Sequence, residues 1–468
     1  MRNFLVAVAL AVGLAACTTT PTAPPVLDLP PASAVDPSLE QWWTAFGDPV
    51  LNGLIDEALA HNLDLAAAIA RVDYGRAAVL LAQSDLYPSV NLAAGAGRSR
   101  TTEVGSNPLP TGFSPLSTNL GVGLQASYEI DLWGKYRTAT AAAKQELMAT
   151  EYARETTRTM VEADTARYYF NLLAADVQLG LLQDTLKLRD ESVALQKDRY
   201  QAGVIGEYDL RTAEAERAAV LGDIAIARRI VTEYESALAT LLGRSPREVF
   251  SPSIARDVDV ARATSVPTLP SGVPSEVLAR RPDVRRAEAQ LAASNLRIDV
   301  AKDDYYPSIS LTGSYGTQAG ALKNLFTGPA VVWGLAASLL QPLIGLKAIE
   351  ANVVAQTARR DEVLINYTQA VQGAFRDAHD ALSASDTTRE ALAAQSERAD
   401  KLRQALELAQ LRYGSGYSPY LEVLDAQRQL LQAQTLQIVA ARNVRLSLVD
   451  FAKAVGGGWE WKTAVALP

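Results

Sequence analysis

The chain has 468 residues, 48% of them hydrophobic, so it is long enough to bury a large core or to form more than one domain. Its formal net charge of -8, with no concentrated basic run, argues against a nucleic-acid partner, because phosphate binding needs a basic face. After the N-terminal segment, no apolar stretch reaches the ~18 residues that a membrane-spanning helix needs, so any membrane crossing is expected to use β-strands.

The N-terminus has the pattern of an exported protein. An apolar run over residues 4–14 is followed by small residues and then by Cys17, the only cysteine in the chain. This pattern predicts a signal peptide over residues 1–16. The position of Cys17 resembles a bacterial lipobox, which implies a mature N-terminal cysteine carrying diacylglycerol and palmitate, with Thr18 favouring sorting to the outer membrane. The alternative is an incidental free thiol.

The remainder of the chain contains two similar halves. The segment Tyr87–Leu92 recurs as Tyr306–Leu311, an offset of 219 residues, and an offset of 213 residues pairs Gly203 with Gly416. Two structural repeats are therefore expected. The predicted division is a proline-rich lipidated tether over 17–40, a first repeat over 41–243, an equatorial connector over 244–274, a second repeat over 275–456 and a tail over 457–468.

Each repeat contains two candidate strands, at about 88–97 and 119–132 in the first and about 307–316 and 330–341 in the second. The clearest alternates apolar with polar or small residues from Leu120 to Leu132. Runs of about ten residues can cross a bilayer as tilted strands, with one face toward lipid and the other toward water. A half-buried soluble sheet is the alternative.

Four strands cannot close a membrane barrel, because single-chain barrels begin at about eight strands. Several chains must then contribute to one barrel. Two chains would give eight strands and a filled interior, whereas three would give twelve and begin to leave a water-filled lumen. We therefore predict a homotrimer.

The longest uninterrupted segments, 135–202 and 347–413, contain no proline and predict long helices. At ~1.5 Å per residue each would reach roughly 100 Å, more than twice the thickness of a bilayer, so most of each helix must stand in water. Apolar residues keep a seven-residue spacing along both segments, which predicts helix-to-helix packing. An ordinary coiled coil would explain the helices but not the amphipathic strands.

Taken together, these features resemble the TolC-like outer-membrane factors of tripartite efflux pumps, most closely the NodT-type lipoprotein branch. The residues that carry the resemblance are Gln41-Trp42-Trp43 with Phe46, Tyr-Pro-Ser before a strand in each repeat, and the turns that begin at Tyr200 and Tyr413. The resemblance implies a mainly α fold with a membrane β-barrel: a trimeric twelve-stranded β-barrel continued by a long periplasmic α-helical barrel.

The family further implies a lipid-anchored protein of the cell outer membrane with a large periplasmic portion. Its partners would be outer-membrane lipid, a periplasmic adaptor (membrane fusion) protein and an inner-membrane transporter of the RND type. Transport would be passive, through an exit duct for small molecules such as drugs or toxic compounds. A duct for type I protein secretion and a non-channel coiled-coil envelope lipoprotein remain as alternatives.

The sequence predicts no enzyme and no metal site. It has no phosphate-binding loop, no HExxH and no CxxC, and its two histidines, His61 and His379, lie in helical segments without a partner. Asp303 and Asp304 are adjacent on a helix and so point in different directions, which makes paired catalytic carboxylates a poor interpretation. No cofactor is expected other than the covalent lipid on Cys17.

The predicted functional residues lie at two turns that end the long helices. By resemblance, Arg199, Tyr200 and Gly203 at one turn and Arg412, Tyr413 and Gly416 at the other would contact the adaptor. A purely structural turn is the alternative for each. The family narrows its lumen near this level with acidic residues, so the resemblance implies Glu407, about two helical turns before Gly416, as the periplasmic gate. In a trimer it would form a ring of three repelling charges. Glu407 could equally be a solvated residue flanking the heptad.

Overall fold

The computed structural model describes residues 41–104, 110, 112–256 and 278–457, and the statements below concern these residues. The predicted signal peptide, Cys17 and the tether therefore lie outside the described residues. The chain divides into two compact units. We call Gly75–Leu147 with Glu288–Ile365 the strand unit, and the described parts of Leu29–Tyr74, Met148–Ala287 and Asn366–Pro468 the helical unit. Within the described ranges, none of the helices combines the length and apolarity needed to cross a membrane.

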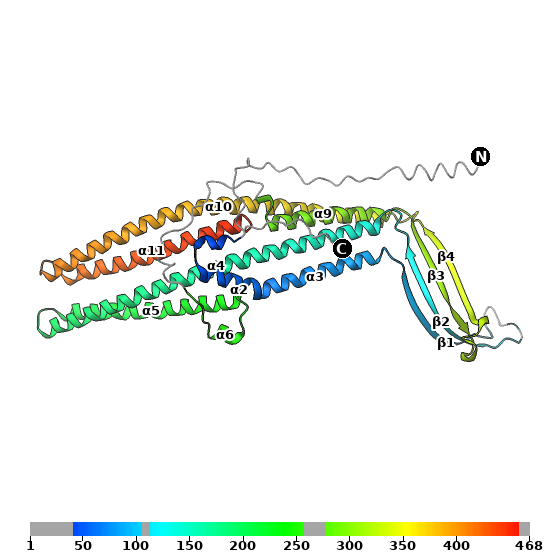
Figure 1. The fold of residues 1–468 in the computed structure, drawn as a ribbon, viewed down its shortest axis with the longest axis horizontal. Coiled ribbons are helices and arrows are strands. Elements are labelled where there is room, and N and C mark those ends of the chain that lie inside the picture. Colours follow the sequence, from blue (N-terminus) through cyan, green and yellow to red (C-terminus); the bar gives the residue numbers. More distant parts are fainter. Residues whose placement is uncertain (1–40, 105–109, 111, 257–277, 458–468) are drawn as a thin grey trace. The chain divides into compact units, whose positions relative to one another are not determined.

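The strand unit contains one antiparallel four-stranded sheet in the order β1-β2-β3-β4 (Figure 1). Its strands are β1 (Ser89–Arg100), β2 (Leu116–Glu129), β3 (Ser308–Ala319) and β4 (Val331–Leu340). All four begin within three residues of the positions that the alternation indicated. β1 and β4 are the outer strands, so each has one edge without a partner strand among the described residues.

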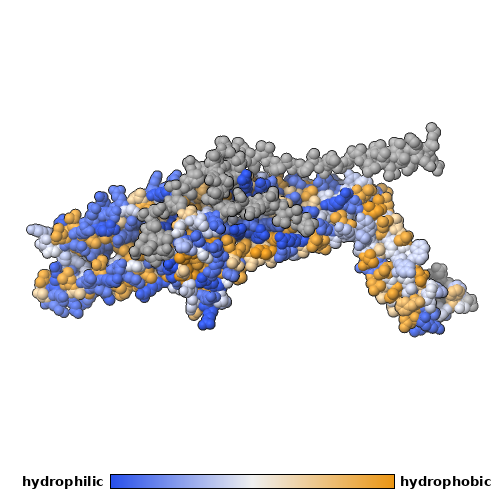
Figure 2. All heavy atoms as spheres, viewed as in Figure 1, coloured by the Kyte–Doolittle hydropathy of each residue, from blue (hydrophilic) through white to orange (hydrophobic). Residues whose placement is uncertain are grey.

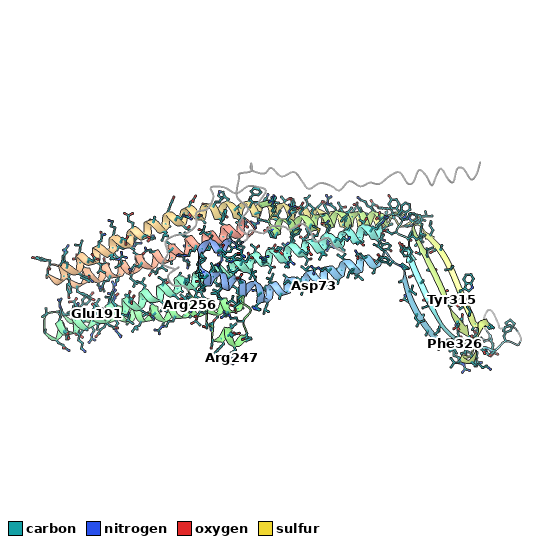
Figure 3. The ribbon with its side chains drawn as sticks, in the orientation of Figure 1. Asp73, Glu191, Arg247, Arg256, Tyr315 and Phe326 are labelled. Atoms are coloured by element: carbon teal, nitrogen blue, oxygen red, sulfur yellow. The ribbon has the colours of Figure 1, made fainter. Side chains whose placement is uncertain are left out.

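The register gives the sheet two different faces. Leu92, Leu124, Tyr315 and Trp333 form one cross-strand row, and the rows on the same face are mostly apolar. On the opposite face, Asn91, Gln125, Ser314 and Gly334 are level with one another. Apolar residues gather over the strands in Figure 2, and Figure 3 shows Tyr315 projecting from β3. On the outer strands β1 and β4 the apolar side chains are exposed in the single chain, as expected of a surface that meets lipid.

Two glycines allow β2 and β3 to approach each other closely. Gly123 lies opposite Gly316, and a Cβ added at Gly316 would stand 2.5 Å from the carbonyl oxygen of Val122. A side chain there would collide with the backbone of the neighbouring strand. The pair of glycines therefore fixes the spacing of the strands that join the two halves of the chain.

The helices of the two halves match in length. The long helices α4 and α10 have 67 and 68 residues, α5 and α11 have 35 each, and α3 and α9 have 22 each. Their bounds are α2 Pro49–His61, α3 Leu63–Ser84, α4 Lys135–Gln201, α5 Glu207–Leu241, α6 Pro246–Phe250, α9 Pro282–Asp303, α10 Lys347–Gly414 and α11 Tyr420–Ala454. Short 3-10 helices occupy Trp42–Phe46, Leu322–Asn324 and Gly328–Ala330.

The helical segment that precedes β1 consists of two helices, α2 and α3. α2 ends at His61 and α3 begins at Leu63, because Asn62 has an extended backbone with ψ 130°. The Asn62 side chain stabilises the break: its Oδ1 accepts from the Leu65 amide at 3.0 Å, and its Nδ2 donates to the Leu241 carbonyl at 2.8 Å. The first bond is a local N-cap contact, whereas the second comes from the end of α5, far away in the sequence.

The core of the helical unit forms where the N-terminal aromatic residues meet α4. Trp42 and Trp43 are buried, and Phe46 packs on Phe170 with ring centroids 4.8 Å apart. Asp48 is fully buried beside them, where its side chain caps α2 and accepts a hydrogen bond from the Tyr169 hydroxyl at 2.7 Å. The aromatic motif at residues 42–46 thus anchors the start of the described chain.

Candidate functional site: the helical hairpin tips

Each hairpin of a long and a shorter helix ends in the same kind of turn. At the first tip, the Gly203 amide donates to the Tyr200 carbonyl and the Val204 amide to the Arg199 carbonyl, both at 2.9 Å. At the second tip, the Gly416 and Tyr417 amides make the equivalent bonds. Gly203 and Gly416 have φ angles of 71° and 77°, the left-handed conformation that a Schellman cap requires. The sequence located both turns because glycine tolerates this conformation.

The two tips contact each other through aromatic and polar side chains. The Arg199 guanidinium lies over the Tyr413 ring, 4.8 Å from its centroid. The Tyr413 hydroxyl is also within hydrogen-bonding distance of the Gln196 amide group, with Nε2 at 3.1 Å. One turn further on, the Tyr420 and Ser192 hydroxyls are 2.6 Å apart. Arg199 and Tyr413, predicted as separate contact residues, therefore form part of one junction between the hairpins.

The remaining predicted tip residues face solvent. Arg412 lies 3.6 Å from Glu422 in an exposed ion pair, and Tyr200 is exposed. Large apolar side chains accompany them: Val204 is 70% exposed and Tyr417 81% exposed. Tyr208 and Leu421 are exposed as well. The tips thus present apolar surface that the single chain leaves uncovered.

Glu407 lies on α10 with its side chain exposed. Neither a hydrogen bond nor an ion pair involving its carboxylate occurs among the described residues. The carboxylate is therefore available to a neighbouring chain or to solvent, and its role as a gate stays a prediction.

Below the tips lies a buried ionic cluster that the sequence analysis missed. Arg189 on α4 is only 3% exposed, and its guanidinium lies 3.6 Å from Glu216 on α5 and donates to the Gln427 side chain on α11. Glu216 also accepts from Arg428 on α11. We call Arg189, Glu216, Gln427 and Arg428 the inter-hairpin cluster. It connects both helices of the first hairpin to the second.

A heptad signal could have revealed this cluster. Leu182, Arg189 and Gln196 are buried residues spaced seven apart along α4. The apolar heptad that is apparent in the sequence, which includes Leu179 and Leu186, lies on a different stripe of the same helix. A charged residue that occupies a heptad core position requires a partner on the facing helix, because an unpaired buried charge is costly.

The charges of the cluster support one another. Burial lowers the pKa of Arg189, and the Glu216 carboxylate opposes this effect. The hydrogen bond from Arg428 is the main cause that lowers the pKa of Glu216 below its usual value. Beside the cluster, a groove of about 470 Å³ runs along residues of α4, α5 and α11. The cluster is thus ionised at neutral pH and borders an open groove.

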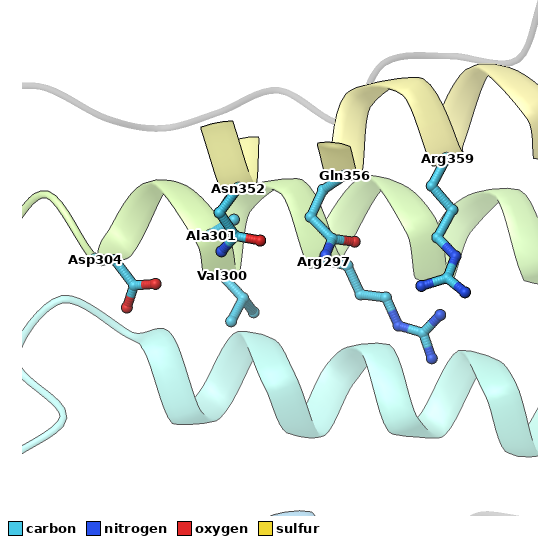
Figure 4. Close-up of a pocket in the computed structure, with 7 residues that line it drawn as sticks. All are labelled: Arg297, Val300, Ala301, Asp304, Asn352, Gln356 and Arg359. Atoms are coloured by element: carbon cyan, nitrogen blue, oxygen red, sulfur yellow. The ribbon is translucent and has the colours of Figure 1, made fainter. Parts of the chain in front are cut away.

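The strand unit has its own polar region near the helix ends. Asp304 pairs with Lys135 at 2.7 Å, and burial, followed by Asp299 nearby, raises the pKa of Asp303 to about 6. An adjacent cavity between α9 and α10 has a volume of about 430 Å³. Figure 4 shows the residues that line it. It is lined by Arg297, Val300, Ala301, Asp304, Asn352, Gln356 and Arg359.

Across the described parts of both units, no three His, Cys, Asp or Glu side chains are placed to hold a metal ion.

Comparison with known proteins connects this geometry to a family. The family model described as "Outer membrane efflux protein" matches residues 54–244 and again residues 273–457. The chain is 32% identical to the solvent efflux pump outer membrane protein SrpC of Pseudomonas putida, covering 88% of this chain and 86% of SrpC. It is also 32% identical to the pyoverdine export outer membrane protein OpmQ of Pseudomonas putida, covering 96% of each.

Solved structures show the same similarity. The Campylobacter jejuni CmeC outer membrane channel matches with a TM-score of 0.86 and 28% identity, covering 94% of this chain and 96% of CmeC. The open state of the Neisseria gonorrhoeae MtrE outer membrane channel matches with a TM-score of 0.80 and 31% identity, covering 94% and 98%. Both are channels, and the similarity extends over both repeats.

Proposed function

The chain belongs to the family of outer membrane efflux proteins, and from this premise we propose that it forms a homotrimeric, passive exit duct that a periplasmic adaptor opens. It is the outer-membrane channel of a tripartite efflux system, with a large periplasmic portion, and is not an enzyme. It works with other components of an efflux pump. The proposal concerns how many copies assemble, what opens them and what passes through.

The unpaired edges of the sheet support the trimer. β1 and β4 each leave one edge free among the described strands, and the apolar face is exposed on both of these outer strands. Because all neighbouring strands are antiparallel, β4 of one copy can pair with β1 of the next. Three copies would supply twelve strands and leave a water-filled lumen, whereas two would leave a filled interior.

The exposed apolar residues at the hairpin tips are the observation that carries the proposal of an adaptor partner. The side chains of Val204, Tyr208, Tyr417 and Leu421 are exposed at or next to the two turns. Arg412 and Tyr200 lie beside them and could add polar and aromatic contacts. A periplasmic adaptor protein that covered this surface would remove apolar area from water, and it would connect the channel to an inner-membrane transporter of the RND type.

The proposed gate is a ring of Glu407 side chains. In a trimer, three exposed carboxylates at one level of α10 would repel one another if the tips converged. Such repulsion weakens the closed state, so a modest preference of the adaptor for the open state would shift the equilibrium.

The substrate proposed is a small organic molecule. Relatives are named for the efflux of solvents, toluene, antibiotics and pyoverdine. The polar face of the sheet fits an unselective duct, because serine, glycine, threonine, asparagine, glutamine and alanine predominate in its rows, with few charges and with Val332 and Leu340 as the large apolar exceptions. A passive lumen needs no specific binding site for its substrate.

We also propose that Cys17 carries diacylglycerol and palmitate. The support is the sequence: a short apolar run, small residues and a single cysteine. A second hydrophobic attachment would add to the contact that the exposed apolar sheet face makes with the outer-membrane lipid.

Single-channel conductance in a planar bilayer tests the proposed function. We expect the detergent-extracted full chain to give a small, mostly closed conductance, and Glu407→Ala to increase the open fraction. Glu397→Ala is the matched control, because Glu397 is an exposed carboxylate on another stripe of the same helix. A protein that remained monomeric and never conducted would refute the duct. A conducting trimer in which both variants behaved alike would refute only the gate.

A further inference from the structure

The sheet carries two arginines on its lipid-facing side. The unbroken register of β1 and β2 places Arg98 level with Thr118 and Arg100 level with Leu116. Successive strand residues alternate between faces, so both arginines lie on the face of Val90 and Leu92. This is the apolar face, continued across the sheet by Leu124.

The sheet has a helix end, where β1 follows α3. The arginines lie about one hydrocarbon thickness from that end. At ~3.3 Å per residue and a tilt of about 40°, the nine steps from Ser89 to Arg98 rise roughly 23 Å, close to the ~25 Å apolar band of membrane barrels. The helix end carries an aromatic belt: Trp133 stacks on Tyr306 with centroids 5.0 Å apart, and Tyr87 is exposed. Arg98 and Arg100 therefore lie at the level of the opposite head groups.

The charge distribution along the strands supports a function at that level. In residues 89–128 and 308–346, the only charged side chains are Arg98, Arg100, Glu103 and Lys323. All four lie at or beyond the strand ends distant from the helices, with a net charge of two positive units. Arg98 has no ion pair among the described residues. Arg100 pairs with Glu103 at 3.2 Å, in an exposed contact that stabilises weakly.

We propose that Arg98 and Arg100 bind the phosphate groups of an anionic lipid in the outer leaflet of the outer membrane. The planar guanidinium binds phosphate oxygens through two parallel hydrogen bonds and keeps its charge at any physiological pH. The apolar residues below, Ala96 and Leu120, form a level row on the same face and would contact the acyl chains. A lipid held by its phosphate here would fix the depth of the sheet in the membrane.

The site requires outer-membrane residence but neither the gate nor the adaptor contact. Arg98 and Arg100 belong to the strand unit, whereas Glu407 and the hairpin tips belong to the helical unit. Loss of lipid binding and loss of channel function can therefore be measured separately on the same protein.

Binding of fluorescent diphosphoryl lipid A to the purified full chain in detergent, followed by anisotropy, tests the proposal. We expect each of Arg98→Gln and Arg100→Gln to weaken binding about fivefold and the double variant about 30-fold, the factors that ~1 kcal/mol for each basic group near anionic lipid provides. Arg98→Lys with Arg100→Lys should retain most of the affinity. Glu103→Gln should tighten binding, because it frees Arg100.

The control is Arg247→Gln, since Arg247 is an exposed arginine on α6, far from the strands in sequence (Figure 3). A double glutamine variant that binds within twofold of the native chain, or an equal loss in the control, would overturn the proposal. Displacement of the lipid by equimolar inorganic phosphate would also overturn it, because it would indicate a site for the free anion. Unchanged conductance of the double variant would show that the duct is intact; if that variant failed to assemble, the single variants and Glu103→Gln would decide.

Discussion

Substituting Glu216 by glutamine tests whether the inter-hairpin cluster holds the two hairpins together. The change preserves size and removes one charge, so Arg189, only 3% exposed, loses its carboxylate partner. Removing one member of a buried ion pair costs ~3–5 kcal/mol. Because Gln427 still accepts from Arg189 and Glu216 is itself 16% exposed, we expect the lower end, about 3 kcal/mol.

Arg428→Gln provides the matched control. Arg428 binds the same carboxylate, but its side chain is 52% exposed, so water replaces most of what the substitution removes. Exposed ion pairs contribute ~0–1 kcal/mol, and we expect a loss in that range. Glu216→Gln removes both ion pairs and Arg428→Gln removes only the exposed one, so the difference between the two losses measures the buried Arg189–Glu216 pair.

Two assays measure the outcome. Thermal unfolding followed by circular dichroism should show a clear decrease in melting temperature for Glu216→Gln and a small one for Arg428→Gln. The open fraction in planar bilayers should rise with Glu216→Gln, because the cluster joins α4 and α5 to α11. The reasoning would be refuted if Glu216→Gln melted no lower than Arg428→Gln. Adding Arg189→Met should restore stability, since it removes the unpaired charge.

The pKa of Glu216 sets the pH range of this effect. It is lowered, mainly by the hydrogen bond from Arg428, so the stabilisation is present above the usual carboxyl range and is lost as the pH falls through the lowered value. The native chain and Glu216→Gln should therefore differ by a constant amount above about pH 5.

Three further substitutions probe the helical unit. Burial raises the pKa of Glu162 to about 7 despite the nearby Arg158, so the folded state binds a proton that the unfolded state releases. The melting temperature should then fall as the pH rises from about 4.5 to about 7, and Glu162→Gln should remove this slope; an unchanged slope would contradict the assignment. Gly243→Ala should cost roughly 2–5 kcal/mol, because Gly243 has φ 67° and its new Cβ would stand 2.0 Å from the His61 carbonyl oxygen. Gly456 ends the corresponding helix of the second repeat with φ 91°, and the nearest atom to an added Cβ would lie 3.5 Å away. Gly456→Ala should therefore lower the stability by only about 1–2 kcal/mol, as measured by thermal unfolding. Equal stability losses for the two variants would count against a steric cause.

Local periodicity predicted most of the elements. The alternation from Leu120 to Leu132 located β2, and the absence of proline over residues 135–202 located α4. Both signals are local, because the spacing of apolar residues follows the period of the strand or helix that they form. β1 gave a weaker signal, since small residues such as Ala93 and Gly95 blur the alternation. Even so, the predicted and observed strands overlap along most of their lengths.

Contacts between distant segments could not be predicted in the same way. The Asn62 side chain at the break donates to the Leu241 carbonyl, 179 positions away in sequence, and the burial of Arg189 depends on residues of two other helices. Such contacts arise only after the hairpins pack. The tips were located because glycine at Gly203 and Gly416 is a local signal, whereas the junction of Arg199 with Tyr413 required the structure.

The pairing of β2 with β3 has a consequence for how such a chain can arise. Each repeat contributes one outer and one inner strand, and the close contact of Gly123 with Gly316 joins the two repeats at the centre of the sheet. A single repeat would hold only a two-stranded ribbon, which is marginal on its own. A gene encoding one repeat would therefore yield a useful protein only if two copies of the repeat paired through these inner strands. Fusion of two such copies makes the pairing intramolecular, and afterwards the repeats are free to diverge, as their different tip sequences show.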